Sequence, residues 1–315
     1  MASILPTLQF IARHPLSSRR PFSAYWRYAR WQVESRLRDE VEFHWIEGSK
    51  LIVRNGMTGA TGNIYCGLHE FVDMAFLLHL LRPGDLFVDV GANIGSYTVL
   101  ASAVCGARSI AIEPDPGTVQ SLKRNVEINR IGDRVTVIEA AIGAAAGMVR
   151  FTVGKDTTNR VAAASDEATR EVKVRTLDDI LANTDPVLIK MDVEGYEPQV
   201  IAGALATLAK QSLAAVITET TDPMIESVMK NCGFVRATYS PIERSIVAGG
   251  GRVAQYAVRQ ARSGQGTAKD GPSPRCRGHR LMNYHQKYAT AYVNDHTEWL
   301  RRCPLCARGL GSATP

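Results

Sequence analysis

The sequence lacks the features of a membrane or secreted protein. It has no apolar run near the roughly 20 residues that a membrane-spanning helix needs. Its six cysteines among 315 residues are too sparse for a disulfide framework. The apolar stretch at residues 4–12 is short, contains Pro6 and follows no basic residue, so it does not resemble a signal peptide. We therefore expect a cytoplasmic protein.

The charge is distributed unevenly along the chain. The composition, 45% hydrophobic and 22% charged, is typical of a globular protein and excludes fibres, collagen and global disorder. The net charge of +6 comes from the ends, because residues 1–38 hold seven Arg and one Glu, and residues 261–315 hold nine basic and three acidic side chains. Residues 39–260 hold 21 basic and 27 acidic residues. This acidic body favours a cationic or neutral ligand over a polyanion.

The composition divides the chain into three parts. We predict a basic, aromatic N-terminal segment at 1–55, a folded domain at 56–260 and a basic tail at 261–315. The tail begins with a linker-like composition and is expected to be poorly ordered or unrelated to the domain. Residues 24–37 predict a helix with an aromatic stripe of Tyr25, Tyr28 and Trp31. That helix packs on the body with its arginines in water, or it contacts a membrane or an acidic partner.

The central domain alternates short β-branched runs with helical segments. The expected strands are residues 86–90, 109–113, 135–139, 187–192 and 213–218, and a helix is expected before them at 70–81. Between the third and fourth strands we expect two hairpin-like runs, at 148–153 and 171–175, followed by a short helix capped by Thr176. Such alternation predicts an α/β fold whose mostly parallel sheet is covered by helices on both faces. Runs 234–239 and 253–259 are expected to pair at the sheet edge, across a turn at Gly249, Gly250 and Gly251.

Two signals predict a nucleoside ligand. The strand at 86–90 enters a glycine turn with Gly91 and Gly95, which brings backbone close to a ligand at the carboxyl edge of the sheet. Glu113 ends the next strand about 20 residues later, at the position that binds a ribose diol in this architecture. Asn93 replaces the middle glycine of a dinucleotide loop, so a pyrophosphate cradle is disfavoured.

A third signal is a charged cluster after the strand at 187–192. Lys190, Asp192 and Glu194 follow an apolar strand and precede a helix, so we expect them at the same carboxyl edge as Gly91 and Glu113. By contrast, His69 and His79, on the helix before the first strand, are interpreted as capping or packing residues.

The three motifs together resemble a known family. The segments Phe-Val-Asp-Val-Gly-Ala-Asn-Ile-Gly at 87–95, Ile-Glu-Pro-Asp at 112–115 and Leu-Ile-Lys-Met-Asp-Val-Glu-Gly-Tyr-Glu at 188–197 are similar, in order and spacing, to the FkbM family of S-adenosylmethionine-dependent methyltransferases. The resemblance covers about residues 60–260, and residues 56–70 also resemble bacterial members. It implies a class I Rossmann-like methyltransferase with a seven-stranded sheet and a final antiparallel pair at the edge.

The family implies the cofactor S-adenosylmethionine and a hydroxyl acceptor on a sugar, glycan or natural product. Carried over by motif, the cofactor-binding residues are Asp89, Gly91, Ala92, Asn93 and Gly95 for the methionine part and ribose edge, Glu113 for the ribose hydroxyls, and Glu139, Ala140 and Ala141 beside the adenine. The sulfonium cation suits an acidic cleft. The acceptor loops, such as 56–67 and 157–165, do not identify the substrate.

Methyl transfer to oxygen requires in-line approach and loss of a proton. Asp192 is the first candidate for the base or for the group that orients the hydroxyl, followed by Glu194 and Lys190. Lys190 either lowers the hydroxyl pKa or neutralises Asp192 in an ion pair. A divalent metal on Asp192, Glu194 and Glu219 is a weaker alternative.

The tail offers a separate metal hypothesis. A tetrahedral zinc site could form from two doublets, Cys276 with His279 and Cys303 with Cys306. The simpler interpretation is a basic extension that binds no metal.

Three rival functions remain. An NAD-dependent oxidoreductase would share the strand, turn and acidic strand end, but Asn93 and the cluster after residue 188 argue against it. A nucleic-acid methyltransferase, such as an RNA enzyme, would use the basic ends, but the acidic body makes a poor phosphate channel and no Asn/Asp-Pro-Pro-Tyr motif is present. No nucleic-acid partner is therefore expected. A binding module without catalysis is the third alternative.

Overall fold

A computed structural model describes residues 4–152, 161, 168–218, 222–248 and 255–259. Its helices are α1 Ile4–Arg13, α2 Pro21–Leu37, α3 Thr58–Cys66, α4 Phe71–Leu80, α5 Ser96–Val99, α6 Pro116–Ile128, α7 Leu177–Ile180, α8 Glu197–Ala202, α9 Leu205–Ala209 and α10 Pro223–Asn231. Its strands are β1 Val41–His44, β2 Lys50–Val53, β3 Leu86–Val90, β4 Arg108–Glu113, β5 Val135–Glu139, β6 Ala141–Ile142, β7 Gly147–Thr152, β8 Thr169–Arg175, β9 Leu188–Met191, β10 Ala215–Thr218, β11 Phe234–Ser240, β12 Ser245–Ala248 and β13 Gln255–Arg259.

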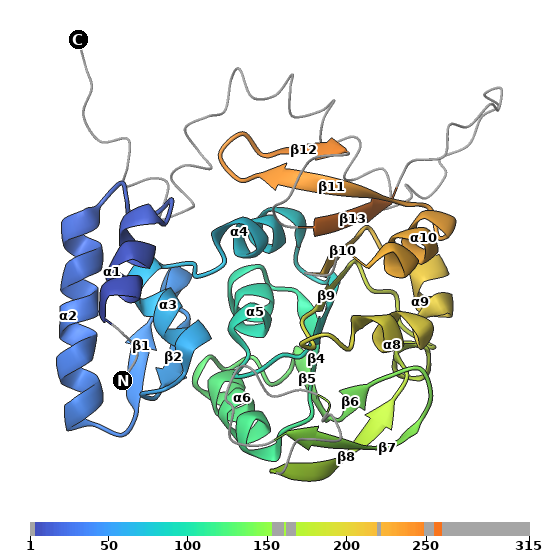
Figure 1. Cartoon of the computed structure of the whole chain (residues 1–315), viewed down its shortest axis with the longest axis horizontal. Helices are drawn as coiled ribbons and strands as arrows, with labels where there is room; N and C mark the ends of the chain where they lie inside the picture. Colours follow the sequence, from blue (N-terminus) through green and yellow to red (C-terminus); the bar gives the residue numbers. More distant parts are fainter. Residues whose placement is uncertain (1–3, 153–160, 162–167, 219–221, 249–254, 260–315) are drawn as a thin grey trace.

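The main sheet runs in the order β12-β11-β13-β10-β9-β3-β4-β5 (Figure 1). Strands β10, β9, β3, β4 and β5 are parallel to one another. Strand β13 is antiparallel to both β10 and β11. The predicted class I Rossmann-like arrangement, with a mostly parallel sheet and a late antiparallel pair, is confirmed.

The predicted number of seven strands is wrong for this sheet. Strand β12 adds an eighth strand at the edge, antiparallel to β11. The sequence did not predict a strand at residues 245–248, because four residues are too few to show a clear alternation of apolar and polar side chains. The expected glycine turn at 249–251 lies outside the described residues.

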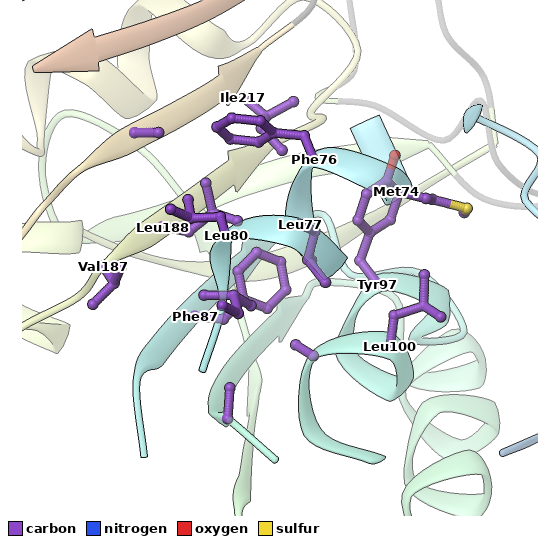
Figure 2. Packing of buried hydrophobic residues seen from close by; sticks show 14 of the residues in the cluster. Met74, Phe76, Leu77, Leu80, Phe87, Tyr97, Leu100, Val187, Leu188 and Ile217 are labelled. Carbon is purple, nitrogen blue, oxygen red and sulfur yellow. The ribbon is translucent and has the colours of Figure 1, made fainter. Parts of the chain in front are cut away.

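Strand alternation sends side chains to two different cores. On one face, Phe87, Leu188 and Ile217 pack beneath α4 (Figure 2). On the other face, Val88, Ile189 and Val216 pack against residues of α7, α8, α9 and α10. Both faces of the central strands are therefore covered, and a ligand is expected at their carboxyl ends.

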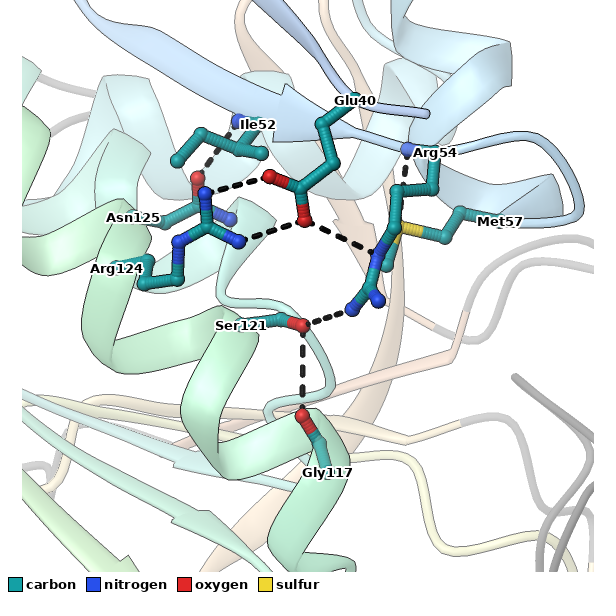
Figure 3. A network of polar contacts seen from close by, with 8 residues as sticks. All are labelled: Glu40, Ile52, Arg54, Met57, Gly117, Ser121, Arg124 and Asn125. Atoms are coloured by element: carbon teal, nitrogen blue, oxygen red, sulfur yellow. Dashed lines mark hydrogen bonds and ion pairs between the residues drawn. The ribbon is translucent and has the colours of Figure 1, made fainter. Parts of the chain in front are cut away.

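The N-terminal elements pack on the same domain. Trp31 of α2 and Leu51 of β2 share a buried cluster with Val99 and Leu122. Polar contacts join the β1–β2 region to α6, with Glu40 accepting two 2.6 Å hydrogen bonds from the Arg124 guanidinium (Figure 3). These contacts fix the chain that continues from β2 into α3.

Several helix starts follow local chemistry. Thr176 accepts a hydrogen bond from the backbone N–H of Asp179, as predicted, and so caps α7. Asp115 accepts one from Thr118 N at 2.8 Å and caps α6, where Pro116 fills the first turn. Among the described residues, no helix is long and apolar enough to cross a membrane.

Candidate active site

The turn after β3 brings main chain to the carboxyl edge of the sheet. Gly91 has a φ of +78°, and a Cβ on it would lie 1.9 Å from the backbone oxygen of Asp192. Only glycine allows this contact between the ends of β3 and β9. Asn93, with a φ of 50°, donates its backbone N–H to Glu113 Oε2 at 2.9 Å. The turn and the acidic end of β4 are thus joined by a hydrogen bond at the same edge of the sheet.

Glu113 is a buried carboxylate with spare acceptor capacity. Its Oε1 accepts the backbone N–H of Asp115 at 3.0 Å, and its side chain lines a cavity at the strand ends. Burial raises the pKa of Glu113 to about 7, against the opposing effect of the two backbone hydrogen bonds. The remaining lone pairs suit hydroxyl donors, and binding such donors favours the ionised form.

Lys190 lies in the floor of the cavity among carboxylates. Its Nζ donates to Asp192 Oδ2 at 2.8 Å and lies 4.6 Å from the centre of the Tyr97 ring. The register also pairs Lys190 with Asp89 on the neighbouring strand. Burial alone would lower the pKa of Lys190, but the charges of Asp192, Glu70 and Asp89 outweigh it and raise that pKa. Lys190 is therefore a permanent buried cation.

Asp89 lies beneath the turn, completely buried beside Lys190. Its Oδ2 accepts the Thr98 hydroxyl at 2.7 Å, whereas its Oδ1 finds no hydrogen-bond partner among the described residues. Burial raises the pKa of Asp89 to about 6, although the Lys190 charge acts in the opposite direction. Because Asp89 also lines the cavity, a donor from a ligand would satisfy a buried acceptor.

Asp192 and Glu194 stand at the mouth of the cavity. The Asp192 side chain is 33% exposed, in contrast to the buried Lys190 with which it pairs. Glu194 has a φ of 51° and also lines the cavity. Burial raises the pKa of Glu194, and the charges of Asp192 and Glu197 add to the effect. Two acidic groups with different surroundings therefore face the same space.

The cavity has a volume of about 310 Å³ and collects nearly all the predicted site residues. Its lining includes Asp89, Gly91, Ala92, Asn93, Glu113, Ala140, Ala141, Lys190, Asp192 and Glu194. Gly95 and Glu139 are absent from that lining. Gly95 packs on α6, where an added Cβ would come within 2.4 Å of Leu122, and Glu139 is exposed.

The wall opposite the strands comes from residues that the sequence motifs do not include. Met57, Ala60 and Asn63 reach the cavity from α3 and its start, and His69 and Glu70 from the chain before α4. The prediction that 56–67 is a loop is wrong, because 58–66 form α3. The other predicted loop, 157–165, lies outside the described residues except for Val161, which lines the cavity.

Glu70 is the clearest omission from the sequence-based site. It accepts a hydrogen bond from the Tyr97 hydroxyl, and its charge acts on Lys190. The signal was present in the sequence as an acidic residue just before the helical pattern at 70–81, but it resembled an ordinary residue at a helix start. Glu70 and Lys190 are 120 residues apart in the sequence, and only the fold brings them close together.

The two histidines differ in position. His69 lines the cavity, and its ring packs on Phe10 with centroids 5.2 Å apart. Burial lowers the pKa of His69, so the ring is neutral at neutral pH. His79 lies outside the cavity lining and contacts the hydroxyl of Tyr239.

No group of three or more potential metal ligands occurs among the described residues. Two metal hypotheses from the sequence involve residues beyond that part of the chain. Glu219 of the Asp192 and Glu194 set lies outside it, and so does the whole tail set of Cys276, His279, Cys303 and Cys306.

Comparisons with known proteins give the site a context. Residues 89–237 match the methyltransferase FkbM domain. The chain is 30% identical over 146 residues to the hexuronic acid methyltransferase AglP of Haloferax volcanii, covering 45% of this chain and 59% of that protein. It is 36% identical over 110 residues to the 31-O-demethyl-FK506 methyltransferase FkbM of Streptomyces tacrolimicus, covering 34% and 42%. The chain thus spans about half the length of these relatives.

Proposed function

Since residues 89–237 match the methyltransferase FkbM domain, we propose that this chain is a methyltransferase of that family and transfers a methyl group from S-adenosylmethionine to a hydroxyl oxygen. The observation that carries the proposal is the acidic cavity, where the glycine turn, Glu113 and the Lys190–Asp192 pair meet at the carboxyl ends of parallel strands. A sulfonium cofactor is a cation and is attracted by this charge.

The residues present fit the cofactor. Gly91 and Ala92 line the cavity, where their backbone is proposed to contact the methionine part. Asp89 offers its unpartnered Oδ1 to an ammonium donor, and Glu113 offers its carboxylate to the ribose diol. Ala140 and Ala141, both buried, form an apolar surface for the adenine. When bound, the cofactor supplies an electrophilic methyl group.

Asp192 is proposed to orient the acceptor hydroxyl. It is partly exposed at the cavity, and its hydrogen bond to Lys190 fixes the carboxylate. The carboxylate is held in place by this bond beside the cavity, so orientation of the acceptor is the role proposed for it. Glu194, whose pKa is raised, is the better acceptor for the proton that the hydroxyl loses. Lys190 acts as the fixed counter-charge that neutralises Asp192.

The proposed acceptor is a hydroxyl of a sugar, glycan or natural product. Two relatives support this class, because one is named for a hexuronic acid and the other for 31-O-demethyl-FK506. The acidic cavity wall disfavours a nucleic-acid acceptor, whose phosphates would be repelled. The rival function is an NAD-dependent reaction, because NAD would bind at the same carboxyl edge of the sheet.

A transfer assay tests the proposal. The full chain is incubated with methyl-labelled S-adenosylmethionine and one of three acceptors: hexuronic acid-containing oligosaccharides, 31-O-demethyl-FK506 or RNA. We expect label in a methyl ether of the sugar or of 31-O-demethyl-FK506, identified by mass spectrometry. Label only in RNA, or at nitrogen or carbon, would contradict an O-methyltransferase.

Replacing Glu113 with Gln is expected to weaken S-adenosylmethionine binding by about 10- to 100-fold, because charged hydrogen bonds contribute about 1.5–3 kcal/mol. The wild-type affinity should increase between pH 6 and 8, since Glu113, with a pKa of about 7, accepts the ribose hydroxyls best when ionised. In Glu113→Gln this pH dependence should become shallower, with only Asp89 still titrating in the lower part of the range. Calorimetry at several pH values measures both effects.

The matched control is Glu139→Gln. Glu139 is the register partner of Glu113 on the next strand, but it is exposed and outside the cavity lining. The control should bind the cofactor as the wild type does. Equal affinities for wild type and Glu113→Gln would remove Glu113 from the proposed ribose site.

A further inference from the structure

The outer face of α2 carries an apolar stripe that nothing in the described structure covers. Phe22, Trp26, Val33 and Leu37 are exposed by 91%, 69%, 58% and 77%. Their spacing of 4, 7 and 4 residues places them along one side of the helix over about 22 Å. Figure 1 shows α2 at the margin of the molecule, with α3 on its inner side. Elsewhere among the described residues, the exposed large apolar side chains are the adjacent Ile4 and Leu5 of α1 and the widely spaced Met148, Leu205, Met224 and Ile242.

The aromatic residues that the sequence suggested for this role lie on the opposite face. Trp31 is 3% exposed, and Tyr28 packs edge-on against Tyr65 of α3 with ring centroids 5.2 Å apart. Arg27 donates to the carbonyl oxygens of Ile64 at 2.9 Å and Tyr65 at 2.6 Å. The helix is therefore held rigidly by its inner face, and the outer stripe has no part in that packing.

The stripe is bordered by positive charge. On the wheel of α2, Arg30 lies on one side of it and Arg36 on the other, and Arg19, Arg20 and Arg38 flank the ends of the helix; all five are exposed. The only acidic side chain within the helix, Glu34, is paired with Arg30 at 2.8 Å. Exposed aromatic and aliphatic side chains between arginines are the pattern of a helix that lies in the interface of an anionic bilayer.

We propose that the outer face of α2 docks the protein on an anionic lipid membrane. The charge distribution favours this occupant over a second copy of the chain, because residues 1–38 carry +6 and two such faces would repel each other. The body at 39–260 carries −6 and is repelled by the same membrane, so α2 faces the lipid. This docking concerns location and is independent of the proposed reaction.

Docking through α2 also sets the position of the cavity. The residues Met57, Ala60 and Asn63, which line it, belong to α3 or its start, and α3 is the helix on which α2 is fixed. The cavity is therefore one helix layer away from the proposed lipid-facing surface.

Co-sedimentation with extruded vesicles tests the proposal. The full chain is mixed with vesicles of phosphatidylcholine alone or with 30% phosphatidylglycerol, in about 0.1 M salt. We expect binding to the anionic vesicles at least tenfold stronger than to the neutral ones, decreasing at high salt because the arginine contribution is screened. Phe22→Ser/Trp26→Ser should lose at least tenfold in partitioning, since two interfacial anchors are removed.

The control is Met148→Ser/Ile242→Ser, which removes two apolar side chains of 61% and 67% exposure far from α2 in sequence. It should bind vesicles as the wild type does, and circular dichroism should show both variants folded. Equal binding by Phe22→Ser/Trp26→Ser and wild type would overturn the proposal, as would wild type that binds neither vesicle. So would light scattering that shows a wild-type dimer and a Phe22→Ser/Trp26→Ser monomer, because α2 would then be a self-association surface.

Discussion

Asp192→Asn is expected to reduce the methyl-transfer turnover by about 100-fold or more while leaving cofactor affinity nearly unchanged. An amide keeps the size of the side chain but loses the charge that holds the acceptor hydroxyl and pairs with Lys190 at 2.8 Å. Groups that orient a nucleophile or move its proton typically contribute about 10²- to 10⁴-fold. Initial rates with labelled cofactor, together with calorimetric cofactor binding, separate the two effects.

Asp133→Asn provides the comparison for this substitution. Asp133 has a 69% exposed side chain and pairs only loosely with Arg134, at 3.6 Å. It is outside the cavity lining, so its amide variant should turn over at the wild-type rate. An Asp192→Asn enzyme that still methylates at full rate would exclude Asp192 from the mechanism but leave the family assignment intact.

Lys190→Met is expected to lower the free energy of unfolding by about 3–5 kcal/mol, the usual cost of removing one partner of a buried ion pair. Lys190 is 5% exposed, and its loss leaves Asp89, Asp192 and Glu70 near one another without a cation. The pKa of Asp89, about 6 with Lys190 present, should increase further. A raised carboxyl pKa costs stability as the pH increases through it, so the deficit should be larger at pH 8 than at pH 5.5.

Urea unfolding at these two pH values measures that deficit. The control is Lys123→Met, which replaces an exposed lysine of α6 and should change the midpoint little. If Lys190→Met unfolds at the wild-type midpoint at pH 8, the carboxylates do not depend on Lys190. The charged floor of the cavity would then require a different explanation.

Much of the sheet could be predicted because its strands are continuous runs rich in β-branched residues. Residues 86–90 and 135–139 form β3 and β5 with the predicted bounds, and the helical pattern at 70–81 forms α4, Phe71–Leu80. Continuous β-branched runs and a 3.6-residue period leave few alternatives. Local chemistry also fixed the cap at Thr176.

The elements that sequence reasoning missed depend on tertiary contacts. Helix α3 contains two glycines and, apart from Ala60, only weak helix formers, so its helix propensity is low. It is held by contacts such as those of Asn63, a fully buried side chain that accepts the His69 N–H at 2.8 Å. The four-residue strands β1 and β2 are likewise too short to stand out by alternation.

The candidate site was predictable only where it follows strand ends. Gly91, Glu113 and Asp192 share the carboxyl edge because parallel strands end together. The contact of Glu70 with Tyr97, and the place of Asp89 beside Lys190, depend on which strands and helices become neighbours. Sequence spacing carries no information about that adjacency, so the acidic surroundings of Lys190 appear only in the fold.

Calorimetric titration of the full chain with S-adenosylmethionine, and in parallel with NAD, tests the central claim most directly. We predict saturable binding of S-adenosylmethionine at one site per chain, weakened by Glu113→Gln but not by Glu139→Gln, and no binding of NAD. No heat with S-adenosylmethionine, together with saturable binding of NAD, would contradict the proposed methyltransferase function.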